Sequence, residues 1–211
     1  MKKILLSILF FSISSFALSL TQVRADLKAF SVAQDSVEMS LRTMVYSSAG
    51  KQAISVYIVK KGPTKIYTEI KSSFMSQRSV VNGSRMKVVD LNTNKIQILP
   101  YNGESLDADK YTHFNPLDRG NWQEPIFISE NMYKIIGAKG VLYYDSKKKR
   151  IEKLEYDGED KFVLTEFTYD AENNLKTMTV SVKANGADTK VVTEVLALRS
   201  SKKFPDKLFE F

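Results

Sequence analysis

Residues 74–101 read FMSQRSVVNGSRMKVVDLNTNKIQILPY, and this stretch decides the class of fold. It contains two turn signals, Asn82-Gly83 and Asn92-Thr93-Asn94. Glycine and asparagine tolerate the positive φ that two- and three-residue hairpin turns require. The stretch therefore predicts three short antiparallel strands joined by two tight turns.

Apolar residues in this stretch recur at every second position. Met86 and Val88 form one such pair, and Ile96 and Ile98 form the next. This alternation is typical of a strand with one apolar and one solvated face, and we expect these four side chains to share the apolar face. A sheet of this kind must close on itself or be covered by another element.

The alternation continues on both sides of the deciding stretch. A short helix is expected near residues 26–34. Further strands are expected at residues 36–46, 54–61, 65–70, 141–144, 151–156, 162–169, 175–183 and 189–198, with an edge strand at 204–211. The fold class is therefore mostly β, with about eleven strands in one antiparallel run.

The pattern breaks at about residues 101–140, which lack clean alternation. Residues 124–136 have helical spacing of their apolar positions, with Pro125 near the first turn and Gly137 after the last. A segment of this length between strands is unusual for a simple loop. We expect a lid of short helices over the sheet.

The N-terminus resembles a secretory signal. Lysines at positions 2–3 precede an apolar run at 4–20 and small residues up to Ala25. We expect residues 1–25 to be removed and 26–211 to form one exported domain. Cleavage after Ala17 is the alternative, and a membrane anchor is the rival interpretation.

Composition excludes several classes of site. The formal net charge is +7, the cations are spread along strands, and we expect no nucleic-acid partner. The dense run at residues 147–150 is interpreted as a solvated hairpin tip, and a contact with acidic lipid or an acidic partner is the alternative. The chain has no cysteine and one histidine, His113, and no ligand spacing or nucleophile motif accompanies it. We expect no metal, no cofactor and no catalysis.

What remains is an apolar surface suited to lipid. A curved sheet under an amphipathic lid can form a cavity for acyl chains. The alternative, a fully packed core without room for a ligand, stays open. The candidate lipid-binding residues are Met39, Leu41, Ile66, Ile70, Met86, Val88, Ile96 and Ile98 on the sheet, and Phe114, Trp122, Ile126, Phe127, Met132, Ile135 and Ile136 in the lid.

Three motifs resemble the LolA family of periplasmic lipoprotein carriers and lipoprotein-sorting proteins. They are VKKGP at residues 59–63, VVNGSRM at 80–86 and PDKLFEF at 205–211. The order of a signal peptide, a helix, six strands, a lid and more strands is similar as well.

The resemblance implies an incompletely closed β-barrel with helices over its mouth. It implies a monomeric periplasmic chaperone that shields the acyl chains of lipoproteins. Such a carrier would take its cargo from an inner-membrane release complex and pass it to an outer-membrane acceptor. It also makes Lys61 the candidate lid latch, in a place where the family has an arginine, and a lysine would hold a lid more weakly. An envelope-stress sensor or a structural envelope protein with the same half-barrel is the alternative.

Overall fold

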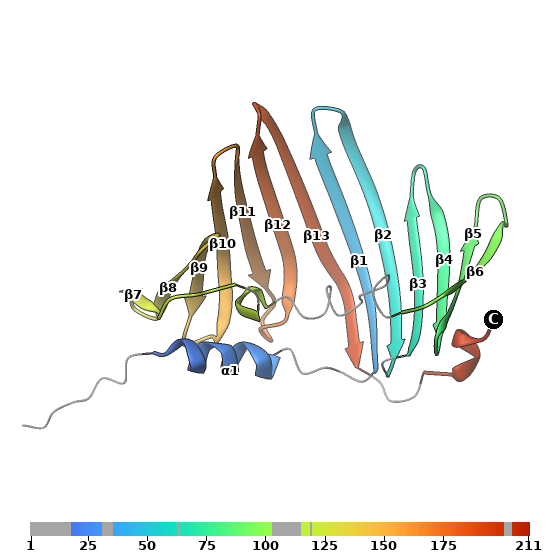
Figure 1. Ribbon diagram of the computed structural model, residues 1–211, viewed down its shortest axis with the longest axis horizontal. Coiled ribbons are helices and arrows are strands. Elements are labelled where there is room, and N and C mark those ends of the chain that lie inside the picture. The colour runs from blue at the N-terminus through green and yellow to red at the C-terminus, as the bar shows by residue number, and fades with distance from the viewer. Residues whose placement is uncertain (1–17, 31–35, 63, 103–114, 119, 201–203) are drawn as a thin grey trace, which may run out of the picture.

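The computed structural model describes residues 18–30, 36–62, 64–102, 115–118, 120–200 and 204–211. The chain forms one antiparallel sheet with a helix at its N-terminal end (Figure 1). The helices are α1 (Leu20–Phe30) and the short 3₁₀ turns η1 (Pro116–Asp118) and η2 (Asp206–Phe209). The strands are β1 (Ser36–Ser47), β2 (Gly50–Lys61), β3 (Lys65–Ser72), β4 (Ser76–Asn82), β5 (Arg85–Asp90), β6 (Ile96–Pro100), β7 (Ile126–Ser129), β8 (Met132–Gly137), β9 (Gly140–Asp145), β10 (Arg150–Gly158), β11 (Lys161–Tyr169), β12 (Leu175–Ala184) and β13 (Ala187–Ser200).

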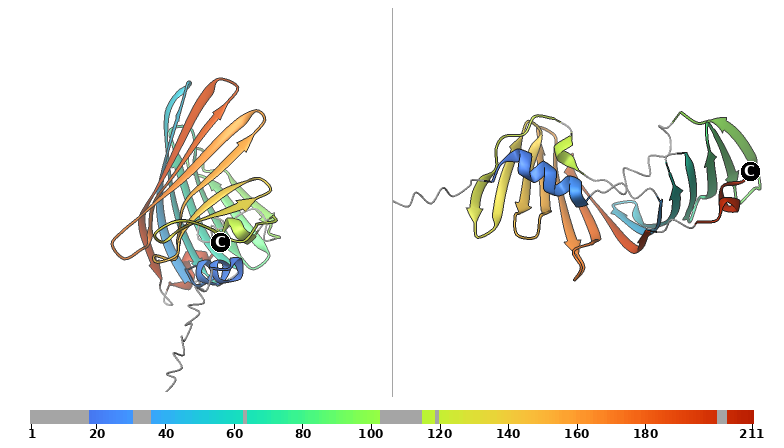
Figure 2. Two further views of the ribbon diagram at one scale, coloured as in Figure 1. Left: turned by 90° about the vertical axis from the view of Figure 1, so that its left-hand side faces the viewer. Right: turned by 90° about the horizontal axis from the view of Figure 1, so that it is seen from below.

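The strand order is β6-β5-β4-β3-β2-β1-β13-β12-β11-β10-β9-β8-β7. Two meanders, β1–β6 and β7–β13, therefore join side by side through β1 and β13. Strands β6 and β7 form the two edges and do not pair with each other, so the barrel stays open (Figure 2). The expected antiparallel, incompletely closed, mostly β fold is confirmed.

The deciding stretch folds as expected into β4, β5 and β6. Gly83 has φ of 65° in the first turn, and Asn94 has φ of 58° in the second. In the second turn, the Asp90 carboxylate accepts hydrogen bonds from the backbone N–H groups of Asn92 and Thr93 at 2.8 and 3.0 Å. Local turn chemistry therefore fixes both hairpins.

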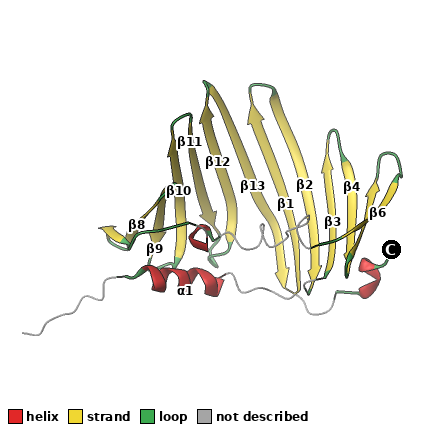
Figure 3. Ribbon diagram, in the orientation of Figure 1, coloured by secondary structure: helices red, strands yellow, loops and turns green. Residues whose placement is uncertain are grey.

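The prediction of a helix at residues 124–136 is wrong. This segment forms the hairpin β7–β8, which adds two strands to the sheet and gives thirteen instead of about eleven (Figure 3). Glu130 adopts φ of 44° in the turn, and β-branched isoleucines on both sides favour extended backbone. The apolar residues matched a helical period by coincidence of their spacing across the turn.

Two terminal elements also differ from expectation. Residues 204–211 do not form an edge strand, because Pro205 precedes the 3₁₀ turn η2. The N-terminal helix begins at Leu20, six residues before the expected Asp26, and continues through Ala25. Both elements pack on the sheet, on opposite faces of it.

Candidate functional site: an apolar trough on the inner face

The inner face of the sheet is the face that α1 and η1 cover. Its β7–β12 half buries a cluster with three residues of the helix, Leu20, Val23 and Leu27. The other buried members of this cluster are Leu117, Ile135, Leu142, Tyr144, Ile151 and Phe167. The lower end of this half is thus closed by the helix (Figures 1 and 2).

Helix α1 is held to the sheet by a buried carboxylate. Asp26 accepts hydrogen bonds from the Tyr144 hydroxyl at 2.9 Å, the Lys149 Nζ at 3.1 Å and the Gln22 Nε2 at 3.1 Å. Burial alone would raise the pKa of Asp26, but these hydrogen bonds outweigh it and hold the pKa below its ordinary value. Burial and the Asp26 charge raise the pKa of Tyr144. The helix is therefore anchored by a charged, hydrogen-bonded group as well as by apolar contact.

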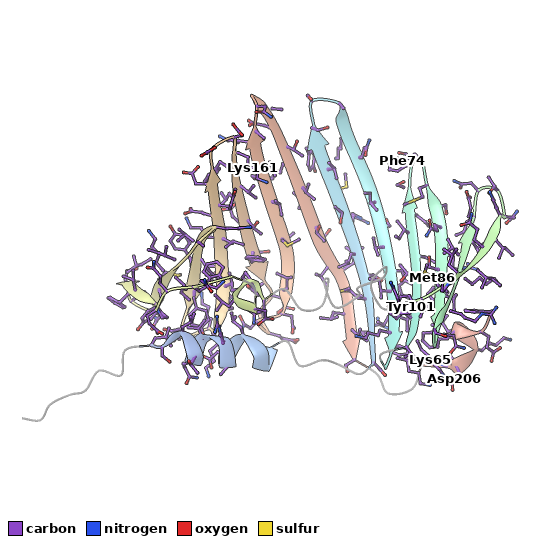
Figure 4. All side chains as sticks on the ribbon, in the orientation of Figure 1. Lys65, Phe74, Met86, Tyr101, Lys161 and Asp206 are labelled. Atoms are coloured by element: carbon purple, nitrogen blue, oxygen red, sulfur yellow. The ribbon has the colours of Figure 1, made fainter. Side chains whose placement is uncertain are left out.

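The other half of the inner face buries a second cluster from β1 to β5. It contains four of the predicted lipid-binding residues, Met39, Leu41, Ile66 and Met86, together with Ile58 and Val81. Two more predicted residues, Ile70 and Val88, lie half-buried on the same face. Tyr101 packs against this cluster from the chain that leaves β6 (Figure 4).

Further aliphatic side chains of the inner face are half-buried on the central strands β11, β12, β13, β1 and β2. They follow the strand register: Val45 of β1 pairs with Val191 of β13, Val191 pairs with Val180 of β12, and Val182 of β12 pairs with Val163 of β11. We call the apolar trough the set formed by Val45, Ile54, Val163, Val180, Val182, Val191 and Val195. Each keeps part of its apolar surface exposed.

The polar side chains beside the trough include uncharged hydroxyls. Thr43 and Thr193 pair across β1 and β13, and their Oγ1 atoms lie 3.1 Å apart. Thr165 is buried beside Val180. Hydroxyls that bond to each other place no net charge against an apolar ligand, and the trough suits an alkyl chain.

The prediction that Ile96 and Ile98 line the cavity is wrong. Ile98 pairs with Lys87 and Ile96 with Val89, so both lie on the opposite face from Met86 and Val88. They are 51% and 56% exposed. Apolar and polar residues alternate within β5 and within β6. The pairing of the two strands, however, sets Ile96 and Ile98 opposite Val89 and Lys87, so these isoleucines share the outer face with them.

Five of the residues expected to form a lid lie in strands β7 and β8 instead. Ile135 is fully buried in the inner-face cluster, and Trp122 packs on that cluster with its Nε1 donating to the Pro116 carbonyl oxygen at 3.2 Å. Phe127 lies on the inner face at the open edge, 58% exposed. The remaining positions alternate to the outer face, namely Ile126, Met132 and Ile136. Phe114 lies outside the described residues.

Lys61, the candidate lid latch, tethers the C-terminal segment among the described residues. Its Nζ donates to the Phe204 carbonyl oxygen at 3.0 Å and to the Asp206 carboxylate at 3.0 Å. Lys65 reaches the same carboxylate at 2.7 Å, and both lysines hold the pKa of Asp206 below its ordinary value (Figure 4). The tether places Phe209, fully buried, against Val59 and Val80 on the outer face.

Sequence reasoning missed the trough residues, although it predicted their strands. The sequence does indicate apolar strand faces here, because valines recur at alternate positions in residues 180–182 and 191–195. Which of the two faces points inward depends on the β1–β13 pairing, and the spacing of residues within a strand does not reveal that pairing.

The described part of the chain contains no group of three or more metal-ligating side chains. Within the same residues, no helix combines the length and the apolar character needed to cross a membrane.

No protein-family model matches the chain, and no curated protein sequence matches it. Solved structures do. A LolA superfamily protein from Nitrosomonas europaea superposes with a TM-score of 0.59 at 13% identity, covering 92% of this chain and 99% of that one. An outer membrane lipoprotein-sorting protein domain from Vibrio parahaemolyticus gives a TM-score of 0.51 at 8% identity, covering 89% and 94%. The chain therefore has a LolA-like fold over most of its length.

Proposed function

We propose that the protein is a non-enzymatic carrier that binds the acyl chains of lipids or lipoproteins in the apolar trough. The observation that carries this proposal is the set of half-buried aliphatic side chains on the central strands of an unclosed sheet. Burying an alkyl chain there gains about 0.8 kcal/mol for each methylene removed from water. The same fold in a lipoprotein-sorting domain supports the choice of ligand.

The proposed place of action is the periplasm, between an inner-membrane donor and an outer-membrane acceptor of lipoproteins. On this proposal the N-terminal signal segment is cleaved on export, and the position of α1 constrains the cleavage site. Cleavage after Ala25 would split the helix and remove the buried Leu20 and Val23. Cleavage after Ala17 would leave α1 whole. We therefore place the boundary of the exported domain between residues 17 and 18.

A fluorescent fatty acid that brightens in apolar surroundings tests the binding site. Val180→Asp and Val191→Asp each place a charge in the trough and should weaken binding at least tenfold, which corresponds to about 1.4 kcal/mol. Val192→Asp is the matched control, because Val192 is half-buried on the same strand but pairs with Met44 and Thr179 on the outer face. Its affinity should stay within about twofold of the unaltered protein.

Equal affinity in the trough variants and the control would contradict the proposal. So would the absence of any fatty-acid uptake combined with no lipid in the protein purified after export. That pair of results would favour the alternative of a structural envelope protein, whose inner face serves as core.

A further inference from the structure

The charge of this protein is divided unevenly between the two meanders. Residues 51–100, which contain β2 to β6, carry nine lysines and arginines against two carboxylates, Glu69 and Asp90. Residues 121–200, which contain β7 to β13, carry twelve cations against thirteen carboxylates. Topology then gathers the excess cations on one side of the open sheet, because β2 to β6 are contiguous in the strand order.

Two carboxylates on this side, Glu69 and Asp206, are each shared between two cations. Glu69 pairs with both Arg78 and Lys71, at 2.8 and 3.2 Å. Asp206 of the C-terminal segment pairs with both Lys61 and Lys65. Each carboxylate neutralises at most one of its two partners, so a net positive charge remains around these strands.

The same side exposes apolar side chains beside its cations. On the outer face, Ile98 lies opposite Lys87 on the neighbouring strand. The Arg85 guanidinium lies 5.5 Å from the centroid of the Phe211 ring, which is 43% exposed. We call this surface, formed by Arg85, Lys87, Lys95, Ile96, Ile98 and Phe211, the β5–β6 rim.

A further aromatic residue lies near one end of this rim. Phe74 is in the turn between β3 and β4 and is 64% exposed (Figure 4). The Leu91 N–H donates to the Ser76 carbonyl oxygen at 2.8 Å, which ties the end of β5 to the start of β4. Phe74 and Ile96 therefore lie at the same end of the sheet.

We propose that the β5–β6 rim docks on the anionic surface of a phospholipid bilayer. Lysines and arginines interspersed with isoleucine and phenylalanine suit an interface that is negatively charged outside and apolar just beneath. The exposed groups come from three chain segments: a hairpin turn, an edge strand and the C-terminus. Phe74 and Ile96 lie at one end of β5 and β6, and Phe211 lies beside Arg85 at the other end. A bilayer is an extended surface that suits groups spread in this way, whereas an added peptide strand would use the β6 backbone alone. The inference goes beyond the proposed function, because it requires no ligand in the trough.

The opposite edge of the sheet provides an internal control. Strand β7 exposes Ile126, Phe127 and Ile128 at 48%, 58% and 46%. Both edges are thus apolar, but β7 belongs to the meander with balanced charge. On this reasoning the charge decides which edge meets the membrane.

The test uses the protein in its exported, processed form and flotation with phosphatidylcholine vesicles, with or without phosphatidylglycerol. Binding is expected to the anionic vesicles at about 0.05 M salt, and about 0.5 M salt should release it by screening. Lys87→Glu with Lys95→Glu should weaken binding at least tenfold, because each cation near an anionic surface contributes about fivefold. Lys134→Glu with Lys139→Glu makes the same charge change on the other meander and should weaken binding less than threefold.

Apolar substitutions test the second component. Ile98→Ser with Phe74→Ser should weaken vesicle binding, and Ile126→Ser with Ile128→Ser, at exposed positions of β7, should leave it unchanged. Fatty-acid uptake in solution should survive in all four double variants, which separates docking from the trough. Conversely, Val180→Asp should keep vesicle binding.

Four results would overturn the inference. They are no binding to anionic vesicles, equal binding to neutral vesicles, equal losses in the two lysine pairs, and binding to polyglutamate in place of vesicles. Concentration-dependent dimers that Ile98→Ser abolishes, without vesicle binding, would likewise assign the rim to a second copy of the chain.

Discussion

The anchor between α1 and the sheet leads to a quantitative prediction for Asp26→Ala. The substitution leaves the fully buried Tyr144 hydroxyl without its acceptor and removes the partner of Lys149. An unsatisfied buried hydroxyl costs about 1–3 kcal/mol, and a half-exposed ion pair contributes about 0–1 kcal/mol. We expect Asp26→Ala to lower the free energy of unfolding by about 3 kcal/mol.

A double-mutant cycle with Tyr144→Phe isolates the shared hydrogen bond. Tyr144→Phe alone should cost about 1.5 kcal/mol, since Asp26 keeps Lys149 and Gln22 as donors. In the Tyr144→Phe background, Asp26→Ala should then cost about half as much as in the unaltered protein. Urea unfolding followed by the fluorescence of Trp122, which packs on the α1 cluster, measures both values.

Two results would refute this reasoning. One is an equal cost of Asp26→Ala in both backgrounds, which would mean that the two groups do not interact. The other is a comparable loss in the control Asp188→Ala, whose carboxylate is exposed.

The pH dependence follows from the lowered pKa of Asp26. Because the folded-state pKa lies below its ordinary value of 3.8, the unfolded chain takes up the proton first as the pH falls. The stabilisation is therefore complete well above pH 3.8 and is lost as the pH falls through the folded-state pKa. The difference between the free energies of unfolding at neutral and at acidic pH should therefore be smaller in Asp26→Ala than in the unaltered protein.

Two other predictions concern the ends of the chain. Phe209→Ala should lower the free energy of unfolding by about 3–5 kcal/mol because the ring is fully buried, whereas Phe211→Ala at the exposed neighbouring site should cost under about 0.5 kcal/mol; equal costs in a urea titration would contradict the packing of η2. The intact mass of the exported protein should correspond to a chain that begins at Leu18, and a chain that begins at Asp26 would show that α1 is dispensable.

The sequence predicted most of the fold because its turns are local. Asn82-Gly83 and Asn185-Gly186 carry their hairpin signals within two residues, and both glycines have positive φ. The β7–β8 hairpin was missed because its turn contains Glu130 in the left-handed region, where a glycine or an asparagine is the usual signal. The other turn residue, Asn131, is a common turn former, but the helical spacing of the apolar residues outweighed this signal.

The candidate site was predictable only in part. Met39 and Leu41 were found because alternation places them on one face and both are buried. Ile98 was misplaced because its face depends on register with β5. The excess of cations on β2 to β6 was missed because these cations are dispersed in the sequence, and only the side-by-side order of the strands brings them together.

The pairing of β1 with β13 has a consequence for the order in which the chain acquires its structure. Val37 lies opposite Ser200, so the contact that unites the meanders joins residues near opposite ends of the domain. Loop closure of this length is slow compared with hairpin formation. A chain emerging from its N-terminus would complete the β1–β6 meander and then wait, with β1 as a bare edge that could pair with another molecule. Pairing of the final strand, β13, with β1 covers this edge and ends the period in which it is exposed.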